Sequence, residues 1–171
     1  MSKRSIIVLA LIALLVTTAA LAAPVVAREV QSRRQTAAVR AATSKYHDVN
    51  AAIADGYLPN QQCVASPEGG MGYHYFNPKL GGDLTSDPLK PELLIYAPNG
   101  NGGLKLVAVE YFQANAGQAR PTILGQPFDG PMPGHEPGMP EHYDLHFWIW
   151  QPNPDGAFAA WNPSVSCAHA H

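Results

Sequence analysis

Proline and glycine interrupt the chain so often after its first third that only short secondary-structure elements fit there. All 15 glycines and all but one of the 16 prolines stand at or after Gly56. Neither residue is favoured inside a long helix, because proline lacks the N–H group and glycine loses backbone entropy. Short runs rich in aromatic and β-branched residues lie between them, which is typical of strands. The pattern predicts at least four strands, at residues 72–76, 92–97, 104–112 and 143–151.

One helix is expected before this region. Apolar residues recur there at intervals of three and four, which places them on one helical face. They are Val39, Ala42, Tyr46, Val49 and Ile53. Gly56 follows where a left-handed cap would end the helix. The sequence therefore predicts a helix over residues 36–55, preceded by a polar lead-in.

The predicted elements indicate an α+β fold. Residues 98–103 read Pro-Asn-Gly-Asn-Gly-Gly, which tolerate positive φ, so the strands on either side should form an antiparallel hairpin. We expect the N-terminal helix to pack on one face of a twisted, mostly antiparallel sheet. The other face would then form a shallow pocket lined by Trp148 and Trp150. A small closed β-barrel is the alternative arrangement.

The N-terminus has the order of features of a secretory signal peptide. Lys3 and Arg4 precede an apolar run over residues 6–16, and small residues follow. The apolar run is shorter than the roughly 20 residues that a membrane-spanning helix needs. We expect residues 1–23 to be removed, leaving a protein that is periplasmic or extracellular and not membrane-bound. Residues 24–35 would be a flexible lead-in, and 36–171 one globular domain with a Pro/Gly-rich surface loop at 125–142.

The two cysteines indicate the cellular compartment, and the charge balance limits the classes of partner. Cys63 and Cys167 are the only cysteines, and in an oxidising compartment they are expected to form a disulfide. The chain carries 11 basic and 13 acidic residues. This mildly acidic balance argues against nucleic acid as a partner.

Polar residues inside apolar strands are the candidates for chemistry. Strand alternation places Glu110 on a face with apolar residues, and a buried carboxylate must be paired, hydrogen-bonded, protonated or bound to a metal. His74 and His146 likewise interrupt apolar strands. Two histidines and a carboxylate from neighbouring strands form an open site for zinc, iron or manganese, with Asp144 as a fourth ligand. The alternative is a structural hydrogen-bond network in the core.

Two further interpretations of the candidate residues remain. The Pro/Gly-rich loop contributes two methionines, a histidine and a glutamate, a donor mixture that would suit copper if the groups converged. These are Met132, His135, Glu136 and Met139. The alternative to a metal-binding protein is a non-catalytic extracellular domain that holds a small molecule or a protein on an aromatic face. The contacts would then be Tyr73, Tyr75, Trp148 and Trp150.

Several segments resemble a pattern found in uncharacterised secreted bacterial proteins. The matching segments are GMGYHYFNP at 70–78, PELLIY at 91–96, VEY at 109–111, LHFWIW at 145–150, and the Asn-Pro pairs at 153–154 and 162–163. The resemblance extends from about Tyr46 to Cys167. It implies secretion and a shared fold, and it supplies no activity and no catalytic residue.

Overall fold

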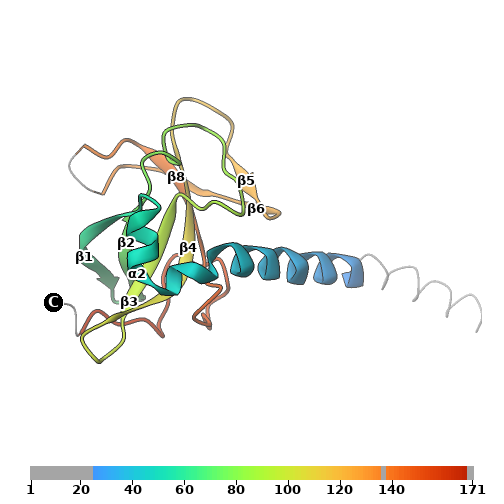
Figure 1. Ribbon diagram of the computed structural model, residues 1–171. Helices are drawn as coiled ribbons and strands as arrows, with labels where there is room; N and C mark the ends of the chain where they lie inside the picture. The colour runs from blue at the N-terminus through green and yellow to red at the C-terminus, as the bar shows by residue number, and fades with distance from the viewer. Residues whose placement is uncertain (1–24, 136–137, 169–171) are drawn as a thin grey trace, which may run out of the picture. The chain divides into compact units, whose positions relative to one another are not determined.

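The computed structural model describes residues 25–135 and 138–168, and it divides the chain into two compact units (Figure 1). The first unit is Met1–Ala37, of which the described residues, 25–37, are helical. The second unit is Ala38–His171, which holds the sheet. The predicted signal peptide, residues 1–23, lies outside the described residues. None of the helices in the described ranges is long and apolar enough to cross a membrane.

The helical segment begins earlier than expected and is interrupted. Residues 25–43 are helical, a 3-10 turn η1 (Ser44–His47) follows, and α2 spans Val49–Ala54. The prediction of one continuous helix over 36–55 is therefore wrong. Asp48 has an extended backbone and its side chain accepts a hydrogen bond of 2.9 Å from the Asn50 N–H. Aspartate is a favourable N-cap, so it starts a new helix here rather than continuing the first.

The domain contains a six-stranded antiparallel sheet in the order β1-β2-β3-β4-β8-β7. Its strands are β1 (Leu58–Ser66), β2 (Gly69–Phe76), β3 (Leu93–Pro98), β4 (Leu104–Ala114), β7 (Asp129–Met132) and β8 (His142–Phe147), and β5 (Thr122–Ile123) pairs separately with β6 (Gln126–Pro127). The sheet curls into a half-barrel (Figure 1). β1 and β7 stand at opposite edges and do not pair within the part of the chain that is described, so the closed barrel is not formed.

The antiparallel α+β architecture, the first three expected strands and the hairpin between β3 and β4 are confirmed, whereas the strand expected at 143–151 ends at Phe147. The Pro/Gly-rich segment differs from the expectation. It contains β6 and β7, and β7 pairs with β8 at the edge of the sheet. An edge strand tolerates proline because one side of its backbone needs no partner in the sheet. Pro131 lies within β7 for this reason.

The two faces of the sheet carry separate apolar clusters. One cluster joins sheet residues to Val39, Tyr46 and Ala52 of the helical segments. The Tyr96 hydroxyl in this cluster donates a 2.6 Å hydrogen bond to the Tyr46 carbonyl. The cluster on the other face includes Leu93, Ile95, Ala108, Phe112 and Trp148. By strand alternation this second face is also the one that bears the candidate metal ligands.

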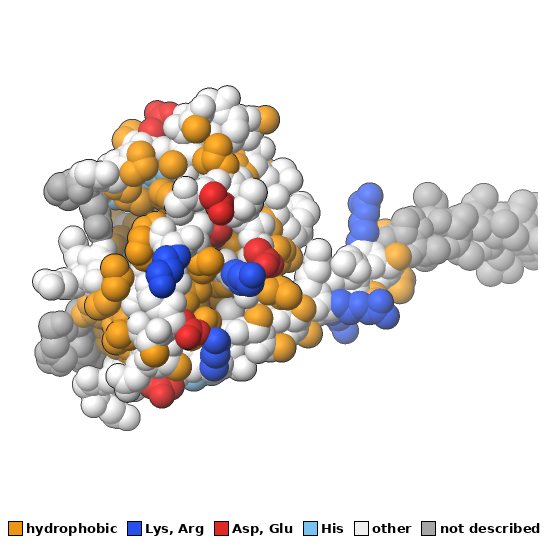
Figure 2. Space-filling view, turned by 45° about the horizontal axis from the view of Figure 1, so that its top comes forward, with side chains coloured by type: hydrophobic (Ala, Val, Ile, Leu, Met, Phe, Trp, Pro, Cys, Tyr) orange, Lys and Arg blue, Asp and Glu red, His pale blue; other side chains and the backbone are white. Residues whose placement is uncertain are grey.

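Cys63 on β1 and Cys167 form a disulfide, as expected, with their Cα atoms 5.8 Å apart. Close to it, Gly70 and Asn162 exchange two backbone hydrogen bonds of 3.1 Å. The C-terminal segment is therefore fixed beside the β1–β2 hairpin. On the face of the molecule shown in Figure 2, acidic and basic side chains are interspersed with hydrophobic ones.

Candidate metal centre

Three strands position the candidate ligands. His74 lies on β2, Glu110 on β4 and His146 on β8, and Glu110 stands directly opposite His146 in the register. β3 separates β2 from β4, so His74 reaches Glu110 across a strand. Two features favour this: the sheet curls, and the side chain of Ala108 beside Glu110 on this face is small. One ligand atom from each of the three residues then lies within 4.8 Å of the others.

Glycine lets the backbone come close beside His74. Gly72 has φ +105°, and a Cβ atom at this position would lie 2.4 Å from the Tyr96 carbonyl oxygen of β3. No side chain fits there without moving the backbone, and the left-handed conformation also favours glycine. β2 and β3 therefore approach each other closely two residues before His74.

The distances within the triad of His74, Glu110 and His146 suit a shared ion better than direct hydrogen bonds. Oε2 of Glu110 lies 3.4 Å from Nε2 of His74 and 3.7 Å from Nε2 of His146. Both distances exceed the usual range for a hydrogen bond to nitrogen. Ligand atoms about 2.0–2.2 Å from a tetrahedral ion lie roughly 3.3–3.6 Å from one another. The two distances to Glu110 are close to this spacing, and all three ligand atoms lie within 4.8 Å of one another.

Three polar atoms of the triad are buried and lack hydrogen-bond partners among the described residues. They are Oε2 of Glu110 and both ring nitrogens of His146. The Glu110 side chain is 5% exposed and that of His146 is 2% exposed. Burying such groups without partners costs several kcal/mol. The geometry of these atoms could hold a metal ion.

Burial also sets the protonation of the triad. Burial is the largest cause that lowers the pKa of His74 to about 3, and it lowers the pKa of His146 as well. Burial, reinforced by the charge of Asp144, raises the pKa of Glu110 well above its usual range. Both imidazoles are therefore neutral at pH 7, which is the form that binds metal. A cation in the centre would offset the cost of ionising Glu110.

The structure brings together three of the four predicted ligands. Asp144 lies on the same face of β8 as His146, but the group of mutually close ligand atoms does not include it among the described residues. Its Oδ2 lies 3.7 Å from Nε2 of His142, whose side chain is fully buried. Asp144 and His142 thus form a second polar pair next to the triad.

The triad lies in the wall of a cavity of about 970 Å³. All three triad residues and the pair of Asp144 and His142 line it. Its apolar wall includes Phe76, Leu93, Phe112 and Met139. Of the loop residues proposed for copper, His135 and Met139 line the cavity, Met132 lies in β7, and Glu136 is outside the described residues. His135 does not belong to the group of close ligand atoms.

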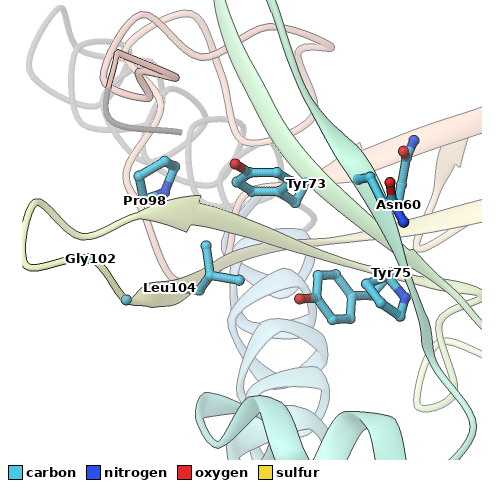
Figure 3. A pocket seen from close by; sticks show the side chains of 9 residues that line it. Asn60, Tyr73, Tyr75, Pro98, Gly102 and Leu104 are labelled. Carbon is cyan, nitrogen blue, oxygen red and sulfur yellow. The ribbon is translucent and has the colours of Figure 1, made fainter. Parts of the chain in front are cut away.

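The four aromatic residues predicted as a ligand-binding face do not share one surface. Trp148 stacks on His146 with ring centroids 5.9 Å apart, whereas Trp150 packs against His47 at 4.3 Å. Tyr73 and Tyr75 line a separate cavity of about 430 Å³ and extend from β2 toward the β3–β4 hairpin (Figure 3). The expected pocket lined by both tryptophans is not formed.

The tryptophans separate because the last strand is shorter than expected. β8 ends at Phe147, and the Ile149 N–H then donates to the Phe147 carbonyl. The Trp150 N–H donates to the Val107 carbonyl instead of continuing a ladder. The two-residue alternation that placed both tryptophans on one face therefore does not extend past Phe147.

Comparison with known proteins assigns no role to this geometry. No protein-family model, no curated protein and no solved structure matches the chain. The functional conclusion therefore depends on the chemistry of the site.

Glu92 is a buried carboxyl group that sequence reasoning missed. It is 1% exposed, and its Oε2 accepts a 3.1 Å hydrogen bond from the Phe112 N–H. Burial raises its pKa to about 7, although this hydrogen bond acts in the opposite direction. Glu92 is the first residue of a predicted strand, so the alternation of apolar and polar residues could not show which face of the sheet it lies on. The only hint was a charged residue directly before four apolar ones.

Replacing Glu92 with glutamine is expected to weaken the pH dependence of stability between about pH 4.5 and 7. The folded pKa lies above the unfolded value, so the wild type is more stable below this window and loses stability as the pH rises through it. A pKa of about 7 instead of 4.5 corresponds to about 3 kcal/mol. Urea unfolding at pH 4.5 and 7.5 measures the loss, with exposed Glu68→Gln as the control. Equal losses in wild type and Glu92→Gln would contradict the prediction.

Proposed function

We propose that this protein is a secreted metal-binding protein in which His74, Glu110 and His146 hold one divalent metal ion. One observation carries the proposal: ligand atoms of half-buried His74 and of buried Glu110 and His146, on three different strands, lie within 4.8 Å of one another. Two imidazoles and one carboxylate suit zinc, iron(II) or manganese. Copper would require a soft ligand such as Met139, which lines the same cavity, in addition to this set.

All three triad residues line the cavity of about 970 Å³, so a metal ion held by them would be accessible from it. Three protein ligands with open positions are typical of catalytic rather than purely structural metal sites. A bound metal would supply Lewis-acid chemistry at this wall. The protein holds the ligands on rigid strands, and Trp148, stacked on His146, restricts the orientation of that ring. The arrangement supports a metalloenzyme more than a metal store.

Secretion is part of the proposal. The order of basic, apolar and small residues at the N-terminus supports export, and the disulfide between Cys63 and Cys167 is typical of proteins in oxidising compartments. A metal site in such a protein is loaded either during export or from the medium. Protein for the metal measurement should therefore come from an exported form.

Metal content measured by mass spectrometry tests the proposal. For protein purified without a chelating resin, we expect about one equivalent of metal per chain, and less than about a tenth of that in His146→Ala. His47→Ala is the matched control, because His47 is exposed and lies on Trp150 outside the triad. It should keep the wild-type metal content.

Circular dichroism establishes that the His146→Ala protein is folded. Wild type that holds no metal after incubation with zinc, iron(II) or manganese would overturn the proposal. Metal that persists unchanged in a folded His146→Ala protein would overturn it as well.

A further inference from the structure

The pair of His142 and Asp144 is not used by the proposed metal site. His142 is 0% exposed, and its Nδ1 lies 3.1 Å from the Pro140 carbonyl oxygen. A carbonyl oxygen only accepts hydrogen bonds, so Nδ1 carries a proton. Nε2 lies 3.7 Å from Oδ2 of Asp144, too far for a hydrogen bond, and it has no hydrogen-bond partner in the described ranges.

With His142 neutral, this pair presents two acceptors with no donor between them, although burial is outweighed by the contacts with Asp144 and Pro140, which raise the pKa of His142. In the neutral ring, Nε2 of His142 offers only a lone pair, and the Asp144 carboxylate also only accepts. The two groups cannot satisfy each other in that state, and both line the cavity. A ligand that brings N–H donors and a positive charge would satisfy both, and charge-assisted hydrogen bonds are the stronger kind.

The charges in the cavity point to the same ligand class. Among the described residues that line it, the carboxylates are Glu110 and Asp144, and no lysine or arginine is present. Arg120 is engaged elsewhere, 3.7 Å from Asp129. Apart from the proposed metal ion, the cavity therefore offers an anionic ligand such as a phosphate or a carboxylate no positively charged side chain. A protonated amine meets a complementary charge at Asp144.

The walls of the cavity are suited to an apolar ligand body. Phe112 stacks on His142, with ring centroids 5.1 Å apart and planes inclined by 27°. Phe76 lies edge-on to Phe112 at 5.7 Å, and Leu93 and Met139 complete this wall. The volume of about 970 Å³ is within the range of small-molecule sites. An aromatic or aliphatic body would pack here while a polar group reaches His142 and Asp144.

We propose that this cavity binds a small, mainly apolar molecule carrying a primary amine, with the ammonium group held between Asp144 and His142. The inference deepens the proposed function by naming a ligand class for the same cavity. It rests on that function only for the metal ion, which would lie beside this pair. The contacts with Asp144, His142 and the apolar wall do not depend on a bound metal ion.

Two probes with the same ring and opposite charge test the inference. Isothermal titration calorimetry of the metal-loaded protein would compare phenethylamine with 3-phenylpropanoate. We expect phenethylamine to bind at least tenfold more tightly. Asp144→Asn should weaken phenethylamine binding tenfold or more with unchanged metal content, and exposed Asp155→Asn should leave it unaltered.

Three results would overturn the inference. One is equal or tighter binding of 3-phenylpropanoate, and another is unaltered phenethylamine binding in Asp144→Asn. The third is a second equivalent of metal that is lost in Asp144→Asn, which would assign the pair to a cation instead. Metal content separates the two proposals. Metal without amine binding removes this inference alone, and amine binding without metal removes the proposed function alone.

Discussion

The double variant Cys63→Ser/Cys167→Ser is expected to lose about 4 kcal/mol of folding free energy. The two cysteines are separated by 104 positions in the sequence. Removing a cross-link over so long a loop increases the entropy of the unfolded chain, which is the main source of the stabilisation. Urea unfolding of wild type and double variant at pH 7 measures the difference in free energy.

Reduction supplies the matched control for this variant. A reducing agent should lower the unfolding midpoint of the wild type toward that of the double variant and leave the double variant unchanged. A loss below about 1 kcal/mol would contradict the prediction. It would mean that the backbone bonds between Gly70 and Asn162 hold the C-terminal segment without the disulfide.

The triad could be predicted because strand alternation depends only on an extended backbone. In β2, β4 and β8 the residues flanking His74, Glu110 and His146 are apolar, so each polar residue stands out on its own strand. The register that sets Glu110 opposite His146 could not be predicted. A segment of 27 residues, 115–141, separates β4 from β8, and no local pattern fixes how such distant strands align.

Elements at the edges of the sheet were missed for a related reason. β1 reads Leu-Pro-Asn-Gln-Gln-Cys-Val-Ala-Ser and has no alternation of apolar and polar residues. It pairs only with β2, and none of its residues is fully buried. Edge strands have one neighbour, so burial selects their residues weakly. β7 was missed because its glycine and proline argue against a strand, although an edge position tolerates both.

Contacts that sequence periodicity does not encode explain the remaining differences between prediction and structure. The Asp48 cap divides the expected helix, and helical periodicity continues on both sides of it, so the pattern gave no sign of the break. Asp144 shares a face with His146, as alternation requires, yet it lies beside His142 instead of joining the triad. Alternation predicts the face of a side chain. It does not predict which neighbour the side chain contacts.

Glu110→Gln is expected to reverse the order of stability between metal-free and metal-loaded protein. In the metal-free protein the variant should be about 1–3 kcal/mol more stable than wild type. The reason is that the amide removes a buried carboxyl group and offers an N–H donor to Nε2 of His146, which has no hydrogen-bond partner in the described part of the chain. In wild type, Oε2 of Glu110 lies 3.7 Å from that nitrogen.

With metal present the order should invert. A ligand at a concentration about 1,000 times its Kd stabilises the folded state by about 4 kcal/mol, and the neutral amide is a poor substitute for the carboxylate, so the variant gains little. Urea unfolding of both proteins with a chelator and with saturating metal measures the two orders, and exposed Glu68→Gln should match wild type in each. A variant that is less stable than wild type in both conditions would assign Glu110 to a structural network. The order of stability of wild type and variant distinguishes the two roles of Glu110. Only a carboxylate that binds the metal destabilises the folded protein without metal and stabilises it with metal.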